Sequence, residues 1–157
     1  VSLAASFVDV SCGFNHTCAV TTAGELYCFG SNGRGQLGDG TTTERATPTR
    51  VGSDADWVSV SAGTGESTCP IKADGRTYCF GRNDSGQLGV GTFTDALSPT
   101  QLPSFIGPQV PVSLDVGGAH VCAVATDGAL SCWGDNILGQ LGYVTGYRTD
   151  AAPILLP

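Results

Sequence analysis

The chain repeats one segment of about fifty residues three times, and this periodicity restricts the available folds more than any other feature. Three kinds of marker recur in phase: Cys18, Cys69 and Cys122; Gln36, Gln87 and Gln140; Pro48, Pro99 and Pro153. The copies occupy residues 8–51, 58–102 and 112–156, so 1–157 is interpreted as a single repeat array. A period of this length is typical of β-propellers and related arrays, in which each repeat is one supersecondary unit.

Each copy has the same order of local signals. Alternating apolar residues, Val8 and Val10 in the first copy, predict a strand that ends at Gly13. A strand through one cysteine, a tight turn ending in glycine and a strand through a second cysteine follow. A glycine-rich loop then leads to a proline, which is expected to open a last extended segment. No segment shows a sustained helical period, so we expect an all-β chain of propeller-type blades.

Six cysteines form three pairs with the same separation: Cys18 and Cys28, Cys69 and Cys79, Cys122 and Cys132. In a hairpin with a three-residue loop ending in glycine, the two cysteines of a pair face each other across the strands. A non-hydrogen-bonded pair brings its Cα atoms to about 4.5 Å, which a disulfide accepts. The register therefore predicts three intra-hairpin disulfides, each stabilising by roughly 2–3 kcal/mol. Such bridges indicate an oxidising location, secreted or at the cell surface.

Other interpretations of the cysteines stay open at this point. The pairs could be buried thiols of a cytosolic protein, or metal ligands, although each pair would then need two further soft ligands. Cys12 has no partner in the pairing scheme. It aligns with Ala62 and Val116, which favours a buried thiol in the core, and the alternative is a bridge to another chain.

The charge balance excludes two classes of partner. The chain has 14 acidic and 7 basic residues and a formal net charge of −7. Nucleic acid requires a basic surface to neutralise its phosphates, and anionic membranes attract one. No apolar run approaches the length that crosses a bilayer. We therefore expect a protein partner or self-association, with no nucleic acid and no membrane insertion.

Patterns typical of catalysis or cofactor binding are missing from the sequence. His16 and His120 share a repeat position two copies apart, so each is expected to make a structural hydrogen bond to a turn. The glycine-rich loops lack the lysine and following helix of a phosphate-binding loop, and no nucleophile elbow occurs. We predict that the chain is not an enzyme and binds no cofactor or metal.

Two sequons mark candidate glycosylation sites at Asn15 and Asn83. Asn83 aligns with Asn32 and Asn136, so a turn already explains its asparagine, and Asn15 is the better candidate in a eukaryotic source. Four loop aromatics are candidates either for anchoring a partner or for packing between blades: Phe93, Phe105, Tyr143 and Tyr147.

From Gly13 to Thr41 the sequence follows the pattern Gly-x-x-His-Thr-Cys-Ala-Val-x-x-x-Gly-x-Leu-x-Cys-Phe-Gly-x-Asn-x-x-Gly-Gln-Leu-Gly-x-Gly-Thr. This pattern resembles the repeat of the regulator of chromosome condensation family. The second copy carries it over 63–92 with one inserted residue and no histidine, and the third carries it from residue 117 but loses the last glycine. The Gly-Gln-Leu-Gly core recurs in all three, and the resemblance covers nearly the whole chain.

The resemblance implies a β-propeller, usually of seven four-stranded blades, so three repeats would make an incomplete ring. The rest of a longer chain, or other copies, would supply the missing blades, in a closed ring or an open filament. The founding family member exchanges nucleotide on a small GTPase and binds chromatin. That nuclear role is not carried over, because this chain looks oxidised and acidic.

The leading functional hypothesis is a non-catalytic extracellular module, structural or protein-binding, that belongs to a longer chain or a surface assembly or filament. The alternative is a secreted inhibitor or ligand-binding propeller similar to the propeller-type β-lactamase inhibitory protein, although no residue selects that target. A carbohydrate-binding module is a third hypothesis, which would depend on the loop aromatics.

Overall fold

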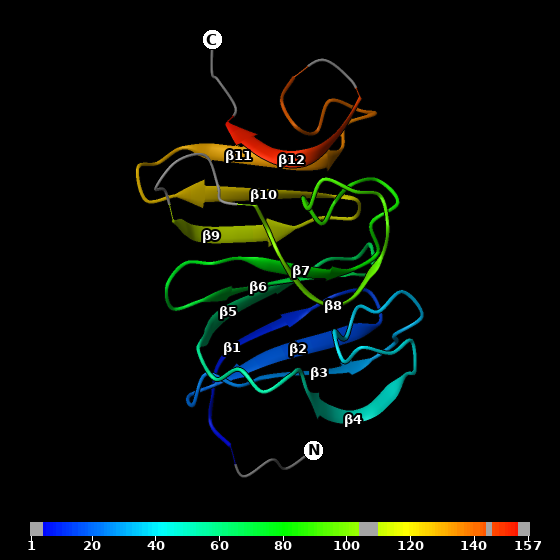
Figure 1. The fold of residues 1–157 in the computed structure, drawn as a ribbon, viewed down its shortest axis with the longest axis vertical. Coiled ribbons are helices and arrows are strands. Elements are labelled where there is room, and N and C mark those ends of the chain that lie inside the picture. Colours follow the sequence, from blue (N-terminus) through cyan, green and yellow to red (C-terminus); the bar gives the residue numbers. More distant parts are fainter. Residues whose placement is uncertain (1–4, 104–109, 144–145, 154–157) are drawn as a thin grey trace.

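The computed structural model describes residues 5–103, 110–143 and 146–153, and the regular elements in these ranges are twelve β-strands. The strands form three antiparallel four-stranded sheets, each built from consecutive strands of one repeat. Figure 1 shows the sheets stacked face to face, the first at the bottom and the third at the top. The all-β, blade-type architecture predicted from the sequence is confirmed. Within the described ranges no helix is long and apolar enough to cross a membrane.

The three sheets are called blades 1, 2 and 3. Blade 1 consists of β1 (Phe7–Cys12), β2 (His16–Thr21), β3 (Leu26–Gly30) and β4 (Arg45–Arg50). Blade 2 consists of β5 (Trp57–Ala62), β6 (Ser67–Lys72), β7 (Tyr78–Gly81) and β8 (Ala96–Gln101). Blade 3 consists of β9 (Pro111–Val116), β10 (His120–Ala125), β11 (Leu130–Asp135) and β12 (Tyr147–Pro153). Strands are hydrogen-bonded in chain order, so the first and fourth strands of each blade are its edges.

The sequence analysis expected the proline of each repeat to open the last strand, and the structure shows that it does not. In blade 1, β4 begins at Arg45 and contains Pro48 in its interior. Among the described strands, β4 pairs only with β3. A proline is tolerated in such an edge strand because its missing N–H can lie on the side that has no neighbouring strand.

Disulfides join the three predicted pairs: Cys18–Cys28, Cys69–Cys79 and Cys122–Cys132. The cysteines of a pair face each other across the second and third strands of their blade, as the count of the hairpin register predicted. Their Cα atoms are 4.1–4.2 Å apart, close to the spacing of a non-hydrogen-bonded pair. Each bridge therefore strengthens one blade and does not connect it to the next.

A buried asparagine organises the glycine-rich loop of each blade. In blade 1, the Asn32 side-chain nitrogen donates to the carbonyl oxygens of Thr41 and Thr43, while its oxygen accepts from the Leu37 backbone N–H. The side chain thus supplies partners to backbone groups that lack them in an irregular loop. The other two copies have the same oxygen-to-leucine bond: Asn83 with Leu88, and Asn136 with Leu141.

The hydrophobic cores lie between blades. The cluster between blades 1 and 2 contains Leu37 and the Cys18–Cys28 bridge from blade 1, and Phe80 from blade 2. The cluster between blades 2 and 3 contains Leu88 from blade 2 and Trp133 from blade 3. Because the main clusters form from facing sheets, a blade completes its core only when a neighbour covers it.

Glycine at the end of the Gly-Gln-Leu-Gly loop allows the next blade to approach. A Cβ atom on Gly38 would lie 2.8 Å from the Phe80 ring, and one on Gly89 would lie 2.5 Å from the Trp133 indole nitrogen. Both glycines also have positive φ, 68° and 69°. Conformation and contact therefore require glycine at the same place.

Candidate interaction site at the open faces of the array

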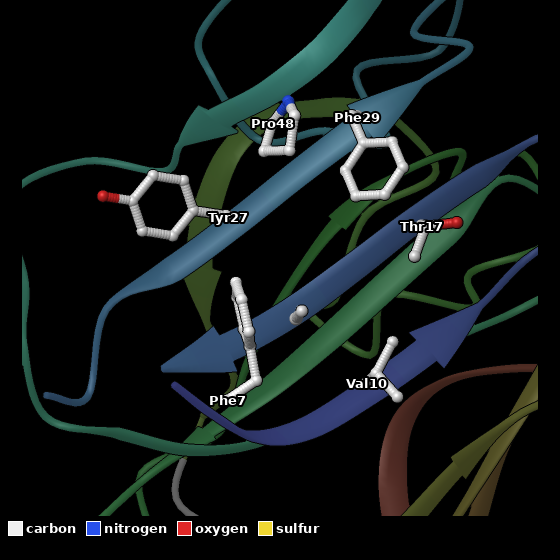
Figure 2. A pocket seen from close by; sticks show the side chains of 7 residues that line it. Phe7, Val10, Thr17, Tyr27, Phe29 and Pro48 are labelled. Carbon is white, nitrogen blue, oxygen red and sulfur yellow. The ribbon is translucent and has the colours of Figure 1, made fainter. Parts of the chain in front are cut away.

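The face of blade 1 that points away from blade 2 is open. Its side chains line a hollow of about 360 Å³ and are called the open face of blade 1: Phe7, Val10, Thr17, Ala19, Tyr27, Phe29 and Pro48. Figure 2 shows the labelled members on one side of the sheet, contributed by all four strands. Two aromatic rings from β3 and one from β1 dominate this surface. An apolar concave face of this kind is typical of a binding or packing surface.

The equivalent side chains of blade 2 are buried against blade 1. Val10 is 62% exposed, whereas its equivalent Val60 is 7% exposed. Phe7 is 43% exposed, whereas its equivalent Trp57 is 3% exposed. The residue types are alike and only the presence of a preceding blade differs. The open face of blade 1 is thus a blade-packing surface that no described residue covers.

Blade 3 is open on its opposite side. Val124 and Leu130 are 37% and 39% exposed there, while their blade 1 equivalents, Val20 and Leu26, are fully buried against blade 2. His120, Gln140 and Leu138 have the repeat positions of His16, Gln36 and Arg34, which contact blade 2, and are assigned to the same side of blade 3; Leu138 is 91% exposed. These five residues, Val124, Leu130, His120, Gln140 and Leu138, are called the open face of blade 3.

A polar relay joins blades 1 and 2 beside the apolar cluster. The Thr68 hydroxyl donates to the Gln36 carbonyl oxygen over 2.9 Å and lies 2.9 Å from His16 Nε2. Since the hydroxyl proton is used toward Gln36, His16 Nε2 carries a proton and donates to Thr68. The sequence predicted a bond from this histidine to a turn; the partner is instead a strand residue of the next blade. His16 therefore has a structural role across the interface.

Burial of His16 predicts a loss of stability in acid. Its side chain is 3% exposed, and this desolvation lowers its pKa to about 4. The unfolded chain, with a pKa near 6.5, binds the proton first as the pH falls, so stability present above pH 6.5 is lost progressively toward pH 4. We expect His16 to account for about 2 kcal/mol of destabilisation between pH 8 and pH 5.

Urea unfolding at both pH values tests this expectation, with H16Q as the reference because glutamine does not titrate. The pH-dependent difference should be smaller in H16Q by that amount. An equal pH dependence in the two proteins would contradict the burial effect.

Hydrogen bonds between the first strands of successive blades follow one rule. A side chain on the first strand of one blade accepts from a backbone N–H on the first strand of the next. Ser11 Oγ accepts from Ala62 at 2.9 Å, and Ser61 Oγ accepts from Val116 at 3.0 Å. Backbone N–H groups on the first strands of blades 2 and 3 are thus satisfied by the preceding blade, which reduces the tendency of these two edges to pair indiscriminately.

Cys12 is a free, exposed thiol, so the expectation of a buried core thiol is wrong for this chain. Its equivalents Ala62 and Val116 are buried, at 8% and 6% exposure. The preceding blade covers those two, whereas no described residue covers Cys12. The Cys12 sulfur lies 3.9 Å from the Thr17 hydroxyl, beside the open face of blade 1. A bridge from Cys12 to another chain stays a prediction.

The two sequons lie in different environments. The Asn83 side chain is fully buried, and its nitrogen donates to the carbonyl oxygens of Thr92 and Thr94. A glycan on that nitrogen is incompatible with this fold. Asn15 is exposed beside β2 and stays a prediction. Three of the loop aromatics are exposed on blades 2 and 3: Phe93, Tyr143 and Tyr147. The fourth, Phe105, lies outside the described residues.

In the part of the chain that the structure describes, no three His, Cys, Asp or Glu residues are grouped to hold a metal ion.

The sequence did not single out Thr17 and Phe29 as interface residues, although both align with residues that lie in the interface between blades 1 and 2, Thr68 and Phe80. The signal was present in the repeat alignment. It could not be used without knowing which face of each blade contacts a neighbour.

Comparison with protein families finds matches over most of the array. The model described as "Regulator of chromosome condensation (RCC1) repeat" matches residues 23–69 and 74–124. A second model with that description matches residues 7–36 and 112–140.

Curated relatives align over most of this chain but are much longer. The chain is 34% identical over 145 residues to the ultraviolet-B receptor UVR8 of Arabidopsis thaliana, covering 91% of this chain and 32% of the relative. It is 38% identical over 135 residues to the X-linked retinitis pigmentosa GTPase regulator of Canis lupus familiaris, covering 85% of this chain and 13% of that protein. The chain thus spans a third or less of these relatives.

Solved structures share the blade arrangement. Prp20p of Saccharomyces cerevisiae superposes with a TM-score of 0.83 at 23% identity, over 94% of this chain and 38% of that one. The ectodomain of the Physcomitrella patens receptor kinase CR4 gives a TM-score of 0.55 at 23% identity, over 85% of this chain and 30% of that one. At this identity the likeness concerns the fold.

Proposed function

The chain belongs to the regulator of chromosome condensation (RCC1) repeat family, and we propose that it is a non-catalytic protein-interaction module within a larger propeller or assembly outside the reducing cytosol. The observation that carries the proposal is the pair of open blade faces. They expose side chains whose equivalents in the other blades are buried between blades. Exposed apolar faces of this kind favour a protein occupant.

Relatives of the same fold support binding to proteins. Prp20p has been studied for its binding to Gsp1p and histones, and yeast RCC1 (Prp20) has been solved bound to Kap60. We extend to this chain only the general role of binding proteins. The net charge of −7 favours a partner other than nucleic acid.

The proposed location rests on the three disulfides. Each pair is held in a hairpin, and such bridges persist in oxidising compartments and are rare in the cytosol. The same fold occurs in a receptor-kinase ectodomain. A structural role in a surface assembly, with a glycan at Asn15 in a eukaryotic source, is part of this proposal.

Thiol labelling of the protein taken from its own cells tests the location. Alkylation without reduction should add one group, at Cys12, and leave the other six cysteines unlabelled. The protein should be recovered in the secreted or cell-surface fraction. Labelling of Cys18 and Cys28, or recovery in the cytosolic fraction, would overturn the extracellular assignment.

Site-specific photo-cross-linking of the whole protein tests the interaction role. A photoreactive residue replaces Leu138, which is 91% exposed on the open face of blade 3. The matched control carries it at Asp127, which is exposed in the hairpin turn of the same blade. Adducts with protein, either another chain or a further repeat of the same chain, are expected at 138 and not at 127. Equal yields, or no adduct at 138, would contradict the proposal.

A further inference from the structure

We propose that the segment joining blades 1 and 2 forms, together with blade 2, a binding site for a primary ammonium group, and that the chain fills this site with its own Lys72. The site consists of Asp54, Asp56, Trp57 and Tyr78, and these four residues are called the ammonium cage. Both blades that enclose the cage are described, so it does not lie at either open face. The inference is independent of the proposed interaction role.

Three strands of blade 2 bring the lysine and the two aromatic rings together. Trp57 is the first residue of β5, Lys72 is the last residue of β6, and Tyr78 is the first residue of β7. Trp57 and Lys72 are direct partners in the register of β5 and β6. The Trp57 and Tyr78 rings stand edge to face, with centroids 5.2 Å apart. Two walls of the cage are therefore aromatic, and the strand ends hold them in place.

The Lys72 ammonium group contacts both rings and both carboxylates. Its Nζ lies 4.8 Å from the Trp57 ring centroid and 5.3 Å from that of Tyr78. These distances are within the range, about 6 Å, over which a cation is attracted to an aromatic ring. Nζ also donates to Asp54 Oδ2 over 2.7 Å and forms an ion pair with Asp56 Oδ1 at 3.0 Å. Aromatic faces combined with carboxylates are the groups that recognise an ammonium ion.

The charge of the lysine is maintained inside the cage. Burial acts to lower the pKa of Lys72, but the carboxylates of Asp54 and Asp56 outweigh this effect, and the pKa is raised above its ordinary value. The side chain is therefore an ammonium ion throughout the physiological pH range. Burying such an ion is costly unless partners compensate it, and here the cage supplies them.

The cage is specific to this blade boundary and is not part of the repeat. In the strand registers, Thr21 and Ala125 hold the position of Lys72, and Phe7 and Pro111 hold that of its aromatic strand partner. Lys72 is also the only lysine of the chain. The repeat pattern therefore does not explain a buried lysine at this place, whereas recognition of its ammonium group does.

The cage opens to solvent on its carboxylate side. The Asp54 and Asp56 side chains are 51% and 45% exposed, whereas the Lys72 side chain is 8% exposed. Truncation of Lys72 at Cβ is therefore expected to open a passage that reaches solvent between the two carboxylates. n-Propylammonium reproduces the part of a lysine side chain beyond Cβ, so it is the matched substitute for the missing ligand.

Occupation of the cage also fixes the connecting segment. On the side of blade 1, Arg50 donates to the carbonyl oxygens of Ser53 and Asp54 at 3.0 and 3.3 Å. On the side of blade 2, Lys72 holds the carboxylate of Asp54. The segment is thus held by a cation from each blade. Lys72 acts as an intramolecular ligand that ties the connection between the blades to blade 2.

Chemical rescue of K72A tests the binding site. K72A should raise the unfolding equilibrium constant by about tenfold, because the lysine stem and its ion pairs are lost. In about 0.2 M n-propylammonium chloride the constant should fall about fivefold relative to sodium chloride of equal ionic strength, as a dissociation constant of about 50 mM requires. Wild type should show no such difference, because Lys72 already occupies the cage. Urea unfolding followed by tryptophan fluorescence measures the constants.

Three controls separate recognition from a general salt effect. K72M keeps an apolar stem in the passage, so n-propylammonium should not stabilise it. K72A combined with D54N and D56N lacks the carboxylates and should lose the response. Tetramethylammonium has no N–H group to donate to the carboxylates, so it should stabilise K72A less than n-propylammonium does.

Limited proteolysis tests the hold on the connecting segment. An endoproteinase that cleaves before aspartate should cut K72A at Asp54 about tenfold faster than wild type, because the segment opens more often without its ligand. n-Propylammonium should slow this cleavage. Cleavage at Asp127, exposed in the hairpin turn of blade 3, is the matched control and should proceed equally in both proteins.

The proposal is overturned if n-propylammonium does not stabilise K72A, or if it stabilises wild type or the variant without carboxylates to the same extent. An equal effect of tetramethylammonium, or unchanged cleavage at Asp54, would also contradict it. Where K72A does not fold in sodium chloride, recovery of the folded state in n-propylammonium supports the proposal, and failure to recover contradicts it.

Discussion

Replacing Phe80 by alanine is expected to destabilise the chain by about 3–5 kcal/mol, because it opens a cavity in the cluster between blades 1 and 2. The Phe80 ring is fully buried, in contact with the loop of blade 1 at Gly38. The same substitution at Phe29, the equivalent residue on the open face of blade 1, should cost less than about 1 kcal/mol in the monomer. There no neighbouring blade packs against the ring, so little burial is lost.

Denaturant unfolding of F80A and F29A at a concentration where the chain is monomeric measures both values. The two variants are matched in residue type, strand and repeat position, so their difference isolates the contribution of the neighbouring blade. Equal losses of unfolding free energy would mean that the aromatic ring stabilises its own blade and not the contact between blades.

Reduction of the three disulfides is expected to remove about 8 kcal/mol of unfolding free energy in the chain-entropy model. Each bridge joins cysteines 10 residues apart and restricts the unfolded chain. A loss of this size is comparable to the whole stability of an ordinary domain, about 5–15 kcal/mol. We therefore expect the reduced chain to unfold at room temperature.

Circular dichroism with increasing phosphine reductant tests this expectation, and mass spectrometry of trapped thiols gives the order in which bridges open. The Cys122–Cys132 bridge should be reduced first, because Cys122 on the open side of blade 3 is only partly buried, while Cys18 and Cys28 are fully buried. C12S should behave like wild type. A reduced chain that keeps its strand signal and its unfolding midpoint would show that the blades are held by packing alone.

Local features of the sequence predicted much of this structure. The count from the hairpin turn placed Cys18 opposite Cys28, because the register of a tight hairpin depends only on its loop. The prediction that Pro48 opens the last strand of its blade was wrong, because an edge strand accepts a proline in its interior that a central strand would not. The predicted partner of His16, a turn, was also wrong. Its partner Thr68 belongs to another blade, and no local rule brings the two together.

The repeat pattern by itself determined the strands, the blades and the disulfides, since each of these depends on residues within one repeat. Only the tertiary structure decided which copies of a repeated residue are buried. Phe29 and Phe80 have the same sequence context, as do Gln36 and Gln140, yet Phe80 and Gln36 are fully buried and their counterparts are not. The physical reason is that a blade buries its faces against its neighbours. Burial therefore depends on a residue's place in the stack, and the open faces lie where the stack of described blades ends.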